Sequence, residues 1–344
     1  MTVTEKLAAL RQNMEARGLE GCIVVTDDFH GSEYVGAHFK AREFLSGFTG
    51  SAGTLAVLRE GAYLWTDGRY FLQAERQLEG SGIQLMRAGQ PGVPTLSQFL
   101  AEQLPESGAL GFDGRTVSTR LHRTLEKALA DKHIRLDGGF DPAAGVWTDR
   151  PDLSTAPVWA FDSGVTRREK LTALRQDMAA QKAEWLLLTD LTDVAWALEL
   201  RGGDVACTPV FLGFLLVGTD SAALYAQAES FAPEIRAALA ADGVALRPYR
   251  CCASSVSSWA TAAGRRKTRS STCPHAMPTA APIAAAAPRS ARRRPSRGAT
   301  RRTPTLRAVS AAAPASRDVR SEHGVSTPPS PQPSHAASPG ANNP

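Results

Sequence analysis

The sequence predicts an α/β fold with two domains of similar architecture, each a mixed sheet flanked by helices. The first observation is an internal repeat: residues 5–20 align without gaps with residues 169–184, with ten identities in sixteen positions. Each copy has the apolar spacing of an amphipathic helix and leads directly into an apolar strand. A repeat distance of 164 residues is too long for a solenoid and indicates two similar domains. The second observation is that strand and helix patterns alternate along the chain, which is typical of α/β sandwiches.

In the first copy, a helix is expected to begin at Thr4 as N-cap and to end at Gly18, and a strand follows over residues 22–25. A hairpin is predicted where residues 54–58 and 62–65 flank a glycine-containing turn. The later elements expected are a helix capped by Asp67, a strand over residues 83–86, a helix from about Thr95, a strand over residues 110–112 and a helix from Ser118.

The second copy continues with fewer elements, and its pattern stops near residue 250. Its expected elements are a helix around residues 194–198, strands over residues 210–217 and 223–226, a helix over residues 232–241 and a strand over residues 244–249. We therefore expect a first domain at residues 1–150, an incomplete second domain at residues 158–250 and a tail at residues 251–344. The segment 141–157, with three prolines, is interpreted as the linker.

The tail differs sharply from the rest of the chain in charge and composition. Residues 251–344 contain 13 Arg and one Lys but only two acids, a charge of +12, whereas residues 1–250 carry −7. The tail also contains 21 Ala, 15 Ser and 13 Pro, one Leu, one Ile and no Phe or Tyr. Such a segment cannot bury enough apolar surface to offset its chain entropy, so we predict that it is disordered. Its abrupt onset suggests a frameshift near codon 250, since out-of-frame reading of a GC-rich gene produces this composition.

Composition also narrows the class of protein. The five cysteines do not form a disulfide framework, and the first 250 residues have no basic character, which suits a cytoplasmic protein without a specific nucleic-acid partner. No signal peptide is expected at the N-terminus, and no apolar run approaches the ~20 residues that span a bilayer. The arginines of segment 292–302 would bind acidic surfaces only non-specifically, because no aromatic residues are interleaved with them.

Three motifs carry a family resemblance. They are HGSEYVGAHFKAREFLSGFTGSAG at residues 30–53, LWTDGRYFLQA at residues 64–74 and TDLTDVAWALELRGGDVACTPV at residues 189–210. In combination they resemble the N-terminal and middle domains of Xaa-Pro aminopeptidases (aminopeptidase P), a family that includes creatinase and prolidase. The resemblance covers residues 1–250. The loop SGFTGSAG could be mistaken for a phosphate loop, but it lacks the GK[ST] ending and the strand-then-helix context of one.

The resemblance implies a peptidase that removes the residue before a proline in second position. In the family a third domain, of pita-bread fold, holds two metal ions, usually Mn, Zn or Co, through two Asp, one His and two Glu. None of these ligands can be matched here, so we expect that this chain lacks the catalytic domain, holds no cofactor and is inactive. The resemblance allows a homodimer for the intact enzyme. The alternatives are a non-catalytic peptide- or protein-binding module and a hydrolase with an unrecognised site.

Arg69 is the one residue to which the resemblance assigns a role. In the family, the arginine of WTDGRYF faces the catalytic pocket and helps to hold the peptide substrate from outside the metal site. A guanidinium suits this task because it stays charged and can bind carbonyl or carboxylate oxygens. The alternative is a structural ion pair with Asp67 or Glu75.

The other polar clusters are interpreted as structural. Asp190 and Asp193 are expected to begin a helix, and Asp204 lies in the same motif without a metal role. His30 and His38 are candidate bases for which no nucleophile is evident. Side chains expected to pack rather than bind a ligand are Tyr34, Trp65, Tyr70 and Trp196. In the tail, Cys251, Cys252, Cys273 and His275 match no common zinc-ligand spacing.

Overall fold

The computed structural model describes residues 1–250 of the chain. The predictions for residues 251–344, namely disorder, a frameshift and the absence of a zinc site, lie outside the described residues. Within residues 1–250, no helix has both the length and the apolar character needed to cross a membrane.

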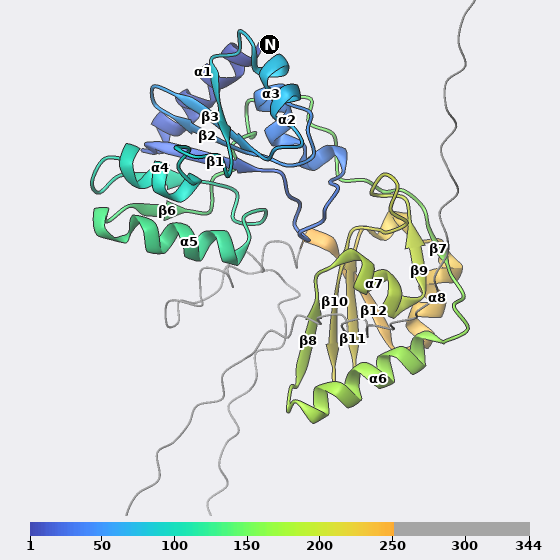
Figure 1. Cartoon of the computed structure of the whole chain (residues 1–344). Helices are drawn as coiled ribbons and strands as arrows, with labels where there is room; N and C mark the ends of the chain where they lie inside the picture. The colour runs from blue at the N-terminus through green and yellow to red at the C-terminus, as the bar shows by residue number, and fades with distance from the viewer. Residues whose placement is uncertain (251–344) are drawn as a thin grey trace, which may run out of the picture. The chain divides into compact units, whose positions relative to one another are not determined.

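The first domain, coloured blue to green in Figure 1, contains a mixed sheet. This sheet has six strands in the order β4-β3-β2-β1-β5-β6. Strands β1, β2 and β3 pair antiparallel, as the predicted hairpin requires, and the three outer pairings are parallel. The strands are β1 (Gly21–Val25), β2 (Thr54–Leu58), β3 (Ala62–Thr66), β4 (Ile83–Arg87), β5 (Ala109–Gly111) and β6 (Arg135–Asp137).

Helices cover both faces of this sheet. The helices are α1 (Val3–Ala16), α2 (Ala41–Ser46), α3 (Phe71–Leu78), α4 (Leu96–Gln103) and α5 (Thr119–Leu129), with short 3-10 turns at Ala37–Phe39 and Ala130–Lys132. Side chains of β1 alternate between two cores: Cys22 and Val24 pack with residues of α1, α2 and α3, whereas Ile23 packs with residues of α4 and α5. This period-two alternation is that of a strand buried on both faces, and the result is a three-layer α/β/α domain.

Local capping explains where most of these helices begin. Thr2, and not Thr4 as expected, caps α1, because it forms a reciprocal capping box with Glu5. The helices predicted to start at about Thr95 and at Ser118 are α4 and α5, and these two residues are their N-caps. The expectation that Asp67 caps α3 was wrong: the cap position is Tyr70, and the Asp67 carboxylate binds the backbone and guanidinium of Arg69.

The second domain contains a four-stranded sheet in the order β12-β11-β10-β8 and a separate pair, β7 with β9. The strands are β7 (Val158–Ala160), β8 (Trp185–Leu188), β9 (Leu200–Gly202), β10 (Gly213–Gly218), β11 (Ala222–Ala226) and β12 (Val244–Pro248). The helices are α6 (Arg167–Ala180), α7 (Leu191–Leu198) and α8 (Pro233–Ala241), with a 3-10 turn at Ala228–Ser230.

The two domains repeat the same construction. Helix α6 has the same 14-residue length as α1, and β8 takes the place of β1 directly after it. Each of these strands starts a series of two antiparallel pairings followed by one parallel pairing, β1-β2-β3-β4 and β8-β10-β11-β12. Within the described residues, however, nothing after β12 corresponds to β5, β6, α4 or α5. The prediction of two related α/β domains is thereby confirmed.

Candidate functional site

Side-chain hydrogen bonds from several elements hold the loop SGFTGSAG, residues 46–53, in the first domain. It begins at the end of α2, where Gly47 adopts φ +73°, a left-handed conformation that favours glycine. The guanidinium of Arg42, which is only 3% exposed, donates to the carbonyl oxygens of Phe48 and Gly50. Burial lowers the pKa of Arg42 to about 10. A buried cation therefore fixes the loop backbone from inside.

The same loop is joined to the strands beside it. The Thr66 hydroxyl donates to the carbonyl oxygen of Ala52 at 2.7 Å, and the Thr26 hydroxyl donates to that of Gly53 at 3.0 Å. The Ser51 hydroxyl lies 2.6 Å from the Tyr70 hydroxyl. These bonds connect the loop to the ends of β1 and β3 and to the start of α3. Tyr70, the neighbour of Arg69, is therefore bonded to this loop.

Arg69, directly before Tyr70, projects into solvent. Its side chain is 68% exposed, and its Nε and Nη2 atoms each donate to one oxygen of Asp67 at 2.9 Å. The Asp67 carboxylate raises the pKa of Arg69, and the Arg69 guanidinium in turn lowers the pKa of Asp67. Because this bidentate contact uses one edge of the guanidinium, the opposite edge remains available to an oxygen of a ligand.

Both interpretations of Arg69, substrate binding and a structural ion pair, are therefore compatible with the structure. The predicted ion pair exists with Asp67 but not with Glu75, whose carboxylate pairs with Arg87. An exposed pair of this kind contributes little to stability, so its main effect is to orient the guanidinium. The role in substrate binding stays a prediction.

His30 is not a free base. It is 8% exposed, and its ring lies 4.2 Å from that of Phe214, in the core of the second domain. Its Nδ1 atom contacts the carbonyl oxygen of Thr189 at 2.9 Å, and Nε2 lies 2.7 Å from the Tyr249 hydroxyl. The carbonyl can only accept, so Nδ1 carries the proton and Nε2 accepts from Tyr249. Burial lowers the pKa of His30, which keeps the ring neutral.

His38 is also engaged, since its Nδ1 atom donates to the carbonyl oxygen of Pro151 at 2.7 Å. Burial lowers the pKa of His38 as well. No local sequence pattern indicates these contacts, because the residues of each pair are more than 100 positions apart.

Two acids beside His30 occupy an unfavourable environment. One oxygen of Asp28 accepts from the amides of His30 and Ser32, while its other oxygen, Oδ2, is buried and has no hydrogen-bond partner among residues 1–250. Burial, together with the negative charge of Asp28, raises the pKa of Asp27 to about 7. The folded protein therefore binds a proton at Asp27 that the unfolded chain has already released above about pH 4.

We expect Asp27→Asn to stabilise the protein at high pH. The folded pKa lies above the unfolded one, so the destabilising effect of Asp27 is absent below about pH 4 and grows as pH rises towards 7. At pH 8 the variant should gain about 1–2 kcal/mol in free energy of unfolding, a value reduced for solvent screening of a partly exposed group. Urea unfolding at both pH values measures it. An equal gain at pH 4 would contradict the titration of Asp27.

The three aspartates of the motif at residues 189–210 do not gather into a metal site. Asp190 caps α7 by accepting from the amides of Thr192 and Asp193, as predicted. Asp204 accepts from the amides of Ala156 and Leu212, and burial raises its pKa. Among the residues that the structure describes, no group of three or more His, Cys, Asp or Glu side chains could hold a metal ion. These residues do not fit the metal pair of the resembled family.

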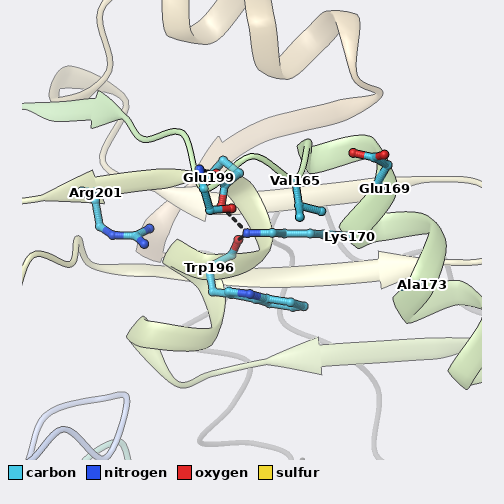
Figure 2. Close-up of a pocket in the computed structure, with 8 residues that line it drawn as sticks. Val165, Glu169, Lys170, Ala173, Trp196, Glu199 and Arg201 are labelled. Atoms are coloured by element: carbon cyan, nitrogen blue, oxygen red, sulfur yellow. Dashed lines mark hydrogen bonds and ion pairs between the residues drawn. The ribbon is translucent and has the colours of Figure 1, made fainter.

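A pocket of about 400 Å³ lies beside α6 and α7 in the second domain (Figure 2). At its base the ammonium of Lys170 contacts the carboxylate of Glu199 and donates to the carbonyl oxygen of Trp196 at 3.0 Å. The indole of Trp196 forms one wall and is 47% exposed, unlike Trp65, which packs in the first core as expected. The buried charges of this pocket already neutralise each other, which favours a structural role for them.

Comparisons with known proteins identify the family of these two domains. Two sequence models, both described as a Creatinase/Prolidase N-terminal domain, match residues 6–140 and residues 149–296. Together these matches cover most of the chain, which therefore belongs to the creatinase/prolidase family.

Within that family, several similar proteins are named as aminopeptidase P or Xaa-Pro aminopeptidase. The chain is 36% identical over 257 residues to Aminopeptidase P2 of Arabidopsis thaliana, covering 72% of this chain and 36% of that protein. It is 38% identical over 230 residues to the probable Xaa-Pro aminopeptidase P of Laccaria bicolor, covering 65% of this chain and again 36% of the relative. The chain thus spans little more than a third of the length of these curated relatives.

A solved structure agrees with the sequence relatives. The X-prolyl aminopeptidase of Caenorhabditis elegans, a cytosolic enzyme with a di-nuclear active site, matches with a TM-score of 0.70 and 30% identity. The match covers 76% of this chain and 45% of that one. These relatives confirm the resemblance to aminopeptidase P and do not favour a non-catalytic binding module.

Proposed function

We propose that residues 1–250 are the substrate-entrance part of a cytoplasmic Xaa-Pro aminopeptidase, and that this chain does not cleave peptides by itself. The observation that carries the proposal is the match to the Caenorhabditis elegans enzyme across both domains, at a TM-score of 0.70. The substrate class would be peptides with proline in second position. The Mn, Zn or Co pair of the parent enzyme would be held outside these two domains, because the described residues offer no suitable ligand group.

The activity of the purified chain tests the first half of this proposal. The full chain is incubated with a Gly-Pro-containing peptide and Mn²⁺, Zn²⁺ or Co²⁺ in turn, and release of the N-terminal residue is followed by mass spectrometry. We expect no release above the level without protein. Metal-dependent release of the N-terminal residue would show that the chain is an active hydrolase.

Arg69 tests the second half in an active enzyme. We would fuse residues 1–250 to the remaining part of a Xaa-Pro aminopeptidase and use the unsubstituted fusion as reference. Arg69→Ala should raise KM by about tenfold with a smaller change in kcat, since a charge-assisted hydrogen bond contributes roughly 1.5–3 kcal/mol. Arg76→Ala removes an exposed arginine of α3, the helix that follows Arg69, and should leave KM unchanged. Equal KM values for the Arg69→Ala fusion and the reference would show that Arg69 does not contribute to substrate binding.

A further inference from the structure

The connection between β1 and α2 of the first domain contains residues 28–39, DFHGSEYVGAHF, which we call the bridging segment. It forms no strand and only one short 3-10 turn, so its backbone is not part of the first sheet. From His30 onwards it lies in the first of the three motifs that carry the family resemblance. Arg69 lies outside this segment, so the proposed function gives the segment no role.

The apolar side chains of the bridging segment lie in the core of the second domain. Phe29 and Phe39 are 9% and 3% exposed, and both belong to the buried cluster that includes residues of α6, α7, β8, β10, β11 and β12. Val35 is partly buried against the same cluster. None of the three belongs to either core of the first domain. The first domain therefore supplies part of the apolar core of the second.

Aromatic rings make direct contacts at this junction. Phe29 packs edge-on against Phe39, with ring centroids 4.9 Å apart, and stacks with Tyr249 at 6.4 Å. The His30 ring lies 4.2 Å from that of Phe214 in β10, and Phe214 in turn stacks with Tyr249 at 5.5 Å. Five rings thus form a continuous cluster from the bridging segment into the second domain, in geometries that stabilise beyond the burial of area alone.

Hydrogen bonds fix the bridging segment near both of its ends. Both ring nitrogens of His30 bond to the second domain, one to the carbonyl oxygen of Thr189 and the other to the hydroxyl of Tyr249. Towards the other end, His38 donates to the carbonyl oxygen of Pro151, which is 113 positions later in the chain. The polar groups of both histidine rings are therefore satisfied by residues that follow the first domain.

The backbone also makes a close contact at Gly36. A Cβ atom at this position would lie 3.3 Å from the carbonyl oxygen of Asp204. The φ of Gly36 is −65°, which any residue can adopt, so the contact and not the backbone conformation favours glycine here. Asp204 is itself held by the amides of Ala156 and Leu212. The bridging segment thus packs directly against the backbone of the second domain.

We propose that the bridging segment is an internal docking element: residues 28–39 complete the core of the second domain and make its stability depend on the first domain. This inference goes beyond the proposed function and does not rest on it. The second copy of the repeat, residues 158–250, is then not a separate folding unit, although its sheet repeats part of the first. Unfolding of the second domain must expose Phe29 and Phe39 to water, which raises its free-energy cost.

Hydrogen exchange of the full chain, measured separately for the two sheets at low denaturant concentration, tests this proposal. Phe39→Ala should speed exchange of the amides of β10, β11 and β12 by about a hundredfold or more, the effect expected for loss of a buried aromatic ring. The amides of β1, β2 and β3 should keep their protection, although residue 39 lies in their own domain.

Phe99→Ala is the matched control. Phe99 is 7% exposed in a core of the first domain, and its replacement should speed exchange in the first sheet instead. Faster exchange of the first sheet in Phe39→Ala, with an unchanged second sheet, would overturn the proposal, because the segment would then stabilise only its own domain.

Tyr249→Phe is a milder variant that keeps the apolar surface of the junction. It should speed exchange of the second sheet by about fivefold, because Nε2 of His30 loses its donor. In a His30→Leu background the same substitution should have no further effect, since the bond is already absent. An equal effect of Tyr249→Phe in both backgrounds would contradict the docking of His30 on the second domain, and with it the proposal.

Discussion

Replacing Lys170 by methionine should lower the free energy of unfolding by about 3–5 kcal/mol, the usual cost of removing one partner of a buried ion pair. The side chains of Lys170 and Glu199 are 4% and 8% exposed, and they are in direct contact. The second oxygen of Glu199 accepts from the amide of Ser163 at 2.8 Å. Without Lys170 this carboxylate would stay buried, bonded to Ser163 but without its opposing charge.

A double variant distinguishes the cost of leaving one charge unpaired from the contribution of the ion pair itself to the free energy of unfolding. Lys170→Met with Glu199→Gln removes both charges and keeps the acceptor for Ser163, so it should recover most of the lost stability. Arg59→Met is the control, because its ion pair with Glu20 is exposed and should contribute less than about 1 kcal/mol. Urea unfolding of the four proteins gives the comparison. A double variant as unstable as Lys170→Met would show that the uncompensated charge is not the cause.

Local patterns in the sequence predict most of the elements that position the candidate site. The hairpin of β2 and β3 and the caps Thr95 and Ser118 depend on neighbouring residues, so a single sequence contains their cause. The three-residue strands β6, β7 and β9 were missed, because so short a run has no visible period.

Contacts between distant residues could not be predicted in this way. Lys170 and Glu199 are 29 positions apart, and His30 and Tyr249 are 219 apart. Each side chain alone reads as an ordinary surface or loop residue, and only the folded chain shows that it is buried. The Asp67 helix cap failed for a related reason: the carboxylate had a stronger partner, the Arg69 guanidinium, two residues away.

Arg42 is buried on a six-residue helix, whereas a charged residue would be expected at the surface. Its side chain has no carboxylate partner among the ion pairs of the described residues. It donates instead to two loop carbonyls and, at 2.8 Å, to the Thr26 hydroxyl, with the Phe48 ring 4.8 Å away. We expect Arg42→Met to lower the free energy of unfolding by about 2–4 kcal/mol, because the buried carbonyl oxygens lose their donors.

Arg42→Lys should recover little of this loss, since an ammonium cannot reproduce the planar fork that reaches Phe48 and Gly50 together. Arg69→Met is the matched control: that guanidinium is exposed, and its removal should change stability by less than about 1 kcal/mol. Hydrogen exchange of the amides of residues 47–53 adds a local measurement. Faster exchange there in Arg42→Met, at a denaturant concentration where the rest of the domain stays protected, is expected if Arg42 holds the loop. Unchanged exchange together with unchanged stability would mean that the other bonds of the loop, such as those to Thr26 and Thr66, hold it without Arg42.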